Sequence, residues 1–146
     1  MSRAERWMVL LLRLTALGCM SAIFAVFMPR TWMAFVHEKL GLGKFPDGPV
    51  IVYLARSVSF FYAGLGVVIW LAATDVRRYV SLIRFVATAG IVFGIVITTS
   101  NVLTGMPWWW QVGEALSVFP LCIVVLWLQH RLAELDSNGS NAHDVD

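Results

Sequence analysis

The sequence predicts an all-α fold, namely an integral membrane antiparallel four-helix bundle with a short interfacial helix in the first outer loop. Of the 146 residues, 59% are hydrophobic and 14% are charged, whereas a soluble domain has roughly 25% charged residues. Four apolar runs approach the roughly 20 residues that cross a bilayer. Each run ends at prolines, glycines or charges, which are typical of loops. No soluble domain fits between the runs, so residues 1–135 form a single transmembrane domain.

The four predicted helices cover residues 7–28, 50–73, 80–103 and 112–130. Arg3 and Arg6 precede the first run as they would in a signal peptide. Arg13 interrupts the apolar core of such a signal, and the run continues to Met28. We therefore expect this segment to be retained as the first transmembrane helix.

The first outer connection contains apolar residues at helical spacing, opposite the polar residues 37–39. These apolar residues are Trp32, Phe35, Val36 and Leu40. An amphipathic segment of this kind lies in the membrane surface. Pro49 then suits the first turn of the second transmembrane helix, because that position needs no N–H donor.

Basic residues give the predicted orientation. Arg3, Arg6, Arg77, Arg78 and Arg131 fall on one side, against Arg30, Lys39 and Lys44 on the other. Because cytoplasmic loops carry the excess of Lys and Arg, we expect a multi-pass protein of the cell (inner) membrane with both termini cytoplasmic. The tail of residues 136–146 is rich in Ser, Asn, Asp and Gly, and we expect it to be a disordered cytoplasmic segment.

Composition and spacing argue against several classes of function. The formal charge is +2 and the basic residues are spread along the chain, so we expect no nucleic-acid partner. Neither of the two cysteines belongs to a Cys-x-x-Cys pair. His37-Glu38 resembles the start of a zinc-protease motif, but Gly41 stands where the second histidine ligand belongs. We therefore predict no metal site and no cofactor. The spans contain no nucleophile constellation, which favours a non-enzymatic protein over an enzyme.

Two charged residues lie inside the predicted spans. Arg56 is six residues in from Val50, or roughly 9 Å along the helix axis. Glu114 follows Trp110 by four residues and enters the fourth helix from the same side of the membrane, about 6 Å along the axis. An unpaired charge in hydrocarbon costs on the order of 3 kcal/mol. We therefore expect Arg56 and Glu114 to form an ion pair.

Further polar residues follow the helical period toward the same region. Tyr53 and Ser57 flank Arg56, Gln111 precedes Glu114 by one turn, and the third helix adds Thr98 and Asn101. Gly90 and Gly94 lie on the same face of the third helix as Thr98 and Asn101. Because glycine has no side chain, this face should let a neighbouring helix approach closely. Two interpretations remain open. The cluster is either a buried polar clasp that fixes helix register or the floor of an outward-facing ligand pocket.

The chain resembles small four-helix bacterial membrane proteins of the DoxX-like kind, which include families of unknown function. The resemblance rests on LLRL at residues 11–14, ARS at 55–57, YAGLG at 62–66 and Glu114. It implies an antiparallel four-helix bundle with an auxiliary or ligand-binding role.

The leading functional hypothesis is a non-enzymatic membrane component that either is auxiliary to other membrane proteins or binds a lipid- or quinone-like ligand. Its expected partners are the lipid bilayer and either other membrane proteins or further copies of itself. One alternative is a small oligomeric transporter in which Glu114 exchanges a proton with a cationic substrate. Another is a membrane enzyme acting on a lipid or quinone head group, with Glu114 as acid or base and Arg56 holding an anion.

Overall fold

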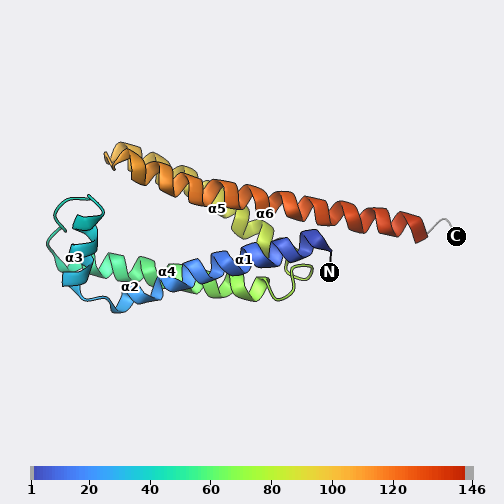
Figure 1. Ribbon diagram of the computed structural model, residues 1–146, viewed down its shortest axis with the longest axis horizontal. Helices are drawn as coiled ribbons and strands as arrows, with labels where there is room; N and C mark the ends of the chain where they lie inside the picture. Colours follow the sequence, from blue (N-terminus) through green and yellow to red (C-terminus); the bar gives the residue numbers. More distant parts are fainter. Residues whose placement is uncertain (1, 144–146) are drawn as a thin grey trace. The chain divides into compact units, whose positions relative to one another are not determined.

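The computed structural model consists of helices joined by short connections (Figure 1). It describes the backbone of residues 2–143 and the side chains of residues 2–135. The helices are α1 (Arg3–Ser21), α2 (Ile23–Phe27), α3 (Arg30–Lys39), α4 (Pro49–Ala72), α5 (Val80–Leu103) and α6 (Trp108–His143). No strand occurs in the described backbone. The predicted all-α fold class is thus confirmed.

Among the described residues, four helical segments are long and apolar enough to cross a membrane, as predicted. They are Arg3–Phe27, Pro49–Ala72, Val80–Leu103 and Trp108–Leu135. The predicted interfacial helix corresponds to α3, and Pro49 is the first residue of α4, as expected. The chain divides into two compact units, one of Met1–Leu11 with Ala72–Asp146 and the other of Leu12–Leu71.

The first unit is built on α5 and α6, which pack side by side (Figure 1). A Cβ added at Gly90 would lie 2.8 Å from Cys122 Sγ, and one at Gly94 would lie 3.1 Å from the Phe119 ring. Real Cβ atoms essentially never come as close as 2.8 Å, and most stay farther away than 3.1 Å, so the two glycines allow the near approach of α6 that their spacing predicted.

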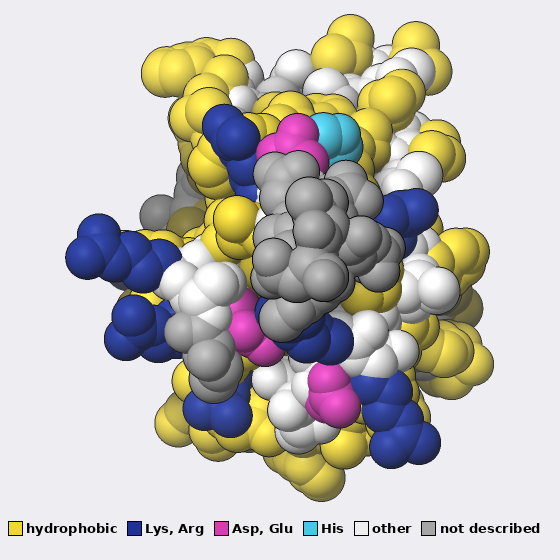
Figure 2. All heavy atoms as spheres, turned by 90° about the vertical axis from the view of Figure 1, so that its right-hand side faces the viewer, with side chains coloured by type: hydrophobic (Ala, Val, Ile, Leu, Met, Phe, Trp, Pro, Cys, Tyr) yellow, Lys and Arg dark blue, Asp and Glu magenta, His cyan; other side chains and the backbone are white. Residues whose placement is uncertain are grey.

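The start of α1, the connection after α4 and the later part of α6 meet at one end of this unit. Ser2 and Glu5 form a capping box, in which each side chain accepts a hydrogen bond from the other residue's backbone N–H at 3.2 Å. Glu5 also accepts a bond from Arg77 Nε at 3.4 Å. Gln129 Nε2 donates to the Val80 carbonyl at 2.9 Å. The end of the molecule at which the chain begins carries many basic side chains (Figure 2).

The second unit pairs the later part of α1 with α4 in antiparallel orientation. Where this part of α1 begins, the Arg13 guanidinium lies 5.5 Å from the centre of the Trp70 ring, near the end of α4. Between these ends, a Cβ on Gly66 would lie 2.7 Å from the Ala16 carbonyl oxygen. At the other end, Arg56 Nη2 donates to the Met28 carbonyl at 3.3 Å. The contacts follow reversed chain order, as an antiparallel pair requires.

Some helix boundaries differ from the predicted ones. The first span is interrupted at Ala22, where the chain forms short-range bonds from Ala22 N to Cys19 O and from Ala25 N to Ala22 O. The last helix begins at Trp108, four residues before the predicted start at 112. Hydropathy predicts which residues lie in the hydrocarbon of the membrane. The helix itself can continue beyond them, until its backbone hydrogen bonds end, so its boundaries can differ from those of the apolar run. The segment from residue 136 onward, predicted to be disordered, continues α6 as far as His143, and residues 144–146 lie outside the described backbone.

Candidate functional site

The turn between α5 and α6 places two of the predicted site residues in direct contact. Asn101 Nδ2 donates a hydrogen bond of 2.6 Å to Glu114 Oε2, and both side chains are half-buried. Gly105 has a φ of 71°, in the left-handed region that closes the end of α5. Backbone bonds from Trp110 and Gln111 to the Pro107 carbonyl then start α6. The short turn therefore fixes how Asn101 and Glu114 face each other.

Gln111 and Ser117 complete the polar groups on this stretch of α6. Gln111 Nε2 donates to the Met106 carbonyl at 2.7 Å, which ties the first turn of α6 to the connection before it. Ser117 Oγ donates to the Glu114 carbonyl at 2.8 Å, within its own helix. Thr98 lies one turn before Asn101 and is half-buried. The side chains of Asn101, Gln111 and Glu114 thus stabilise the turn.

The remaining predicted site residues lie in the second unit, early in α4. The Arg56 side chain is exposed, and its hydrogen bond reaches the Met28 carbonyl, just before α3 begins. Tyr53, one turn earlier, is exposed as well, whereas Ser57 is half-buried. Among the described residues of this unit, no carboxylate is bonded to Arg56.

Arg56 and Glu114 therefore each have a partner within their own unit, a backbone carbonyl and a side-chain amide respectively. The ion pair expected between them stays a prediction. Chemically, the exposed guanidinium can bind an anionic or carbonyl oxygen. The carboxylate of Glu114 retains an oxygen, Oε1, that can accept another hydrogen bond or a proton.

One buried polar residue had not been singled out from the sequence. The Gln129 side chain is 6% exposed, and its Oε1 has no partner among the described residues. Its Nε2 bond to Val80 links α6 to the first residue of α5. In the sequence, Gln129 stands at the end of an apolar run, just before basic residues. That position does not predict whether its side chain is buried or exposed to solvent.

In the part of the chain whose side chains are described, no group of three or more His, Cys, Asp or Glu residues could hold a metal ion. No protein-family model, curated protein or solved structure matches the chain. The resemblance to DoxX-like proteins therefore stays a prediction.

Proposed function

We propose that this chain is a non-enzymatic auxiliary protein of the cell membrane that binds a lipid- or quinone-like molecule in the outer leaflet. In this proposal Arg56 contacts the polar head group of the ligand. Both termini lie in the cytoplasm, and α3 rests on the opposite surface.

The position of Arg56 is the observation that carries this proposal. Its exposed guanidinium lies seven residues after Pro49 in a 24-residue apolar helix. A cation at such a depth is unfavourable in hydrocarbon by several kcal/mol unless it finds acceptors or reaches the interface. The Met28 carbonyl supplies one acceptor. A phosphate, carboxylate or quinone carbonyl would supply the others.

The surroundings of Arg56 suit an amphiphilic ligand. Tyr53 lies on the same face of α4 and is 68% exposed, so its phenol can contact a head group while its ring lies among acyl chains. Exposed apolar side chains from α4, including Phe60 and Phe61, continue further along the span. A ligand with a polar head and an apolar body would match this sequence of groups.

The arrangement at the basic end supports the proposed orientation. The contacts of Glu5 and Gln129 place the start of α1, the connection after α4 and the later part of α6 at one end of the first unit. These segments contain most of the arginines. They are Arg3, Arg6, Arg77, Arg78 and Arg131, and all are exposed. An excess of basic residues of this kind marks the cytoplasmic side.

Lipid analysis of the extracted protein tests the proposal. The full chain is taken from the membrane with its surrounding lipid in polymer-bounded discs, and each lipid and quinone is compared with the bulk membrane. We expect at least one acidic lipid or quinone to be enriched about tenfold, equivalent to about 1.4 kcal/mol. Arg56→Gln should remove the enrichment.

Arg84→Gln is the matched control, because Arg84 is also an exposed arginine in the first turns of an apolar helix, but in α5. It should keep the enrichment. Equal lipid profiles for the wild-type protein and Arg56→Gln would contradict the proposal. Native mass spectrometry of the same samples would also reveal a protein partner or a homo-oligomer.

A small transporter is the second candidate, because Glu114 is held by an amide and not by a cation in its own unit. Such a carboxylate can exchange a proton with a cationic substrate. Efflux of the cationic dye ethidium from cells that produce the protein would test this. Loss of efflux in Glu114→Gln, with efflux kept in Glu134→Gln, would favour the transporter. Efflux that does not exceed that of cells without the protein would count against it.

A further inference from the structure

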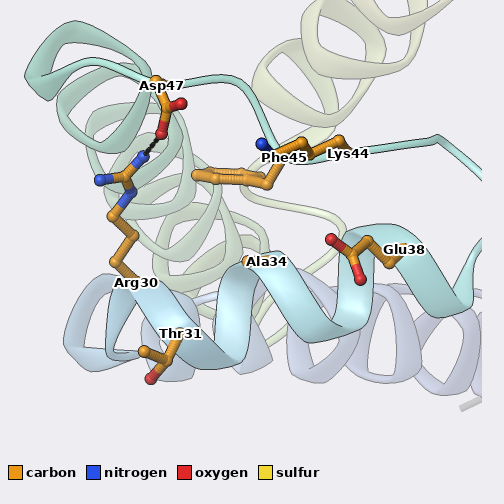
Figure 3. A pocket seen from close by; sticks show the side chains of 7 residues that line it. All are labelled: Arg30, Thr31, Ala34, Glu38, Lys44, Phe45 and Asp47. Carbon is orange, nitrogen blue, oxygen red and sulfur yellow. Dashed lines mark hydrogen bonds and ion pairs between the residues drawn. The ribbon is translucent and has the colours of Figure 1, made fainter.

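The connection between α3 and α4 encloses a hollow on the polar side of α3. Its volume is about 270 Å³, and it opens to solvent. Four lining residues belong to α3 and three to the connection (Figure 3). They are Arg30, Thr31, Ala34 and Glu38 from α3, and Lys44, Phe45 and Asp47 from the connection.

The connection is fastened to α3 at both ends of this hollow. At one end, His37 Nδ1 lies 3.0 Å from the Gly43 carbonyl oxygen, and the His37 ring meets the Phe45 ring edge-on at 5.4 Å. Gly43 has a φ of 83°, which turns the chain back toward α4. At the other end, Arg30 forms an ion pair with Asp47 (Figure 3). These contacts hold the hollow open in a defined shape.

Four charged side chains line the hollow, and two of them form an ion pair with each other. Arg30 and Asp47 neutralise each other. Glu38 and Lys44 also line the hollow, and among the described residues neither side chain has a hydrogen bond or an ion pair. One anion and one cation thus remain available in the same small space. A ligand that itself has one positive and one negative group would match both.

The other face of α3 indicates where this hollow lies. Four apolar side chains on that face are 43–66% exposed, namely Trp32, Phe35, Val36 and Leu40. An exposed apolar stripe on a short helix beside transmembrane spans lies in the bilayer interface. The Lys39 ammonium lies 5.6 Å from the centre of the Phe35 ring, so it remains at the border of this stripe. The hollow is therefore at the level of lipid head groups.

We propose that the hollow binds a zwitterion formed by a protonated primary amine and a phosphate, the chemistry of ethanolamine phosphate. Glu38 accepts hydrogen bonds from the amine, while Lys44 binds the phosphate with Arg30 beside it. The volume is slightly below the roughly 300–1,000 Å³ of pockets for drug-sized molecules, which suits a small head group. A primary amine is required because a trimethylated nitrogen has no N–H to donate to the carboxylate.

This site goes beyond the proposed function, because it uses none of the residues assigned to the ligand of Arg56. The two can therefore fail separately. The shared chemistry also has two sources, a phospholipid head group and free ethanolamine phosphate.

Native mass spectrometry of the full chain in mild detergent tests the site with added lipids of identical acyl chains. The lipids are phosphatidylethanolamine, phosphatidylcholine and phosphatidylglycerol. We expect the wild-type protein to bind phosphatidylethanolamine about tenfold more tightly than the other two, equivalent to about 1.4 kcal/mol. Glu38→Gln and Lys44→Gln should each abolish this preference.

Two further variants separate the site from general charge effects. Lys39→Gln changes a cation of α3 that does not line the hollow, and it should keep the preference. The double reversal of Glu38→Lys with Lys44→Glu keeps one charge of each sign, so it should restore binding that each single reversal removes. Glu38 and Lys44 are exposed, and unchanged circular dichroism would show that the variants fold.

Calorimetry with soluble ethanolamine phosphate distinguishes the two sources. If soluble ethanolamine phosphate binds and Glu38→Gln weakens this binding, the site is assigned to a free small molecule. Preference for phosphatidylethanolamine without binding of the soluble compound assigns it to the lipid. The proposal is overturned if the wild-type protein shows neither, or if Glu38→Gln and Lys44→Gln leave both unchanged. The enrichment tested with Arg56→Gln is an independent measurement and reports on the other site.

Discussion

The side-chain amide of Asn101 donates a 2.6 Å hydrogen bond to the carboxylate of Glu114, across the turn that joins α5 and α6. Asn101 lies near the C-terminal end of α5 and Glu114 near the N-terminal end of α6. Both helices are long and apolar enough to cross a membrane, where a lone carboxylate is unfavourable. A bond to an ionised acceptor is stronger than one between neutral groups. The contact therefore satisfies a charge and fixes the register of two helices at the same time.

Asn101→Leu should lower the free energy of unfolding by about 1 kcal/mol, since hydrogen bonds between membrane helices average about 0.6 and reach about 1.7 kcal/mol. Glu114→Gln should lower it less, because an amide can still accept the bond from Asn101. Reversible unfolding in mixed micelles measures both. The double-mutant cycle of Asn101→Leu with Glu114→Leu, each of which removes the bond, supplies the coupling energy, and strictly additive losses would show that the contact does not stabilise the fold.

The long elements were predictable because they depend on simple physical requirements. A run of apolar residues that spans hydrocarbon must satisfy its backbone bonds within a helix. This requirement alone predicted α5 with its bounds at Val80 and Leu103. Pro49 likewise predicted the start of α4, because its ring fits the first helical position. The interruption at Ala22 gave no such signal, since no proline or glycine marks that position.

The candidate site was less predictable, because it depends on which helices are neighbours. Counting the rise along each helix gave similar depths for Arg56 and Glu114, so Arg56 was the predicted partner of the carboxylate, and Asn101 was expected only in the same region. The short α5–α6 turn brings Asn101 to Glu114. The hollow beside α3 had no sequence signal at all, because Arg30 and Asp47 are far apart in the chain and meet only after Gly41 and Gly43 turn the connection back.

A fluorescent label on α3 should report which face of this helix contacts lipid. In a variant without Cys19 and Cys122, a polarity-sensitive dye on Phe35→Cys should emit at shorter wavelength in lipid discs than the same dye on Thr31→Cys. Phe35 is on the exposed apolar face, whereas Thr31 lines the hollow on the polar side. Equal emission from the two positions would contradict a helix that lies on the membrane with its apolar face inward.

Reporter fusions should place the two ends of the chain in the cytoplasm. We expect alkaline phosphatase, which is active only outside the cytoplasm, to be inactive after Leu135 and active after Lys44. A green fluorescent protein that folds in the cytoplasm should give the opposite pattern. The reason is the excess of arginine at the start of α1, between α4 and α5, and late in α6. Phosphatase activity after Leu135 would reverse the orientation and place Arg56 near the cytoplasm.

Two glycines of α4 that are two residues apart, Gly64 and Gly66, should differ in their response to alanine. At Gly66, an added Cβ would lie 2.7 Å from the Ala16 carbonyl oxygen and 2.8 Å from the Met20 nitrogen. Both are backbone atoms of α1, which cannot move aside as the tip of a flexible side chain can. Forcing an extra methyl group into packed contacts costs about 1–3 kcal/mol, so Gly66→Ala should lower the free energy of unfolding.

Gly64 provides the control for this loss, because nothing lies within 4 Å of a Cβ added there. Alanine is favoured over glycine in a helix interior by about 1 kcal/mol, so Gly64→Ala should leave stability unchanged or raise it by up to that amount. Unfolding of the two variants in the same micelles gives the comparison. Equal stability of Gly66→Ala and Gly64→Ala would mean that α1 does not pack on α4 through Gly66. In that case the antiparallel pairing in the second unit would have to rest on the contacts of Arg13 and Arg56 near its ends.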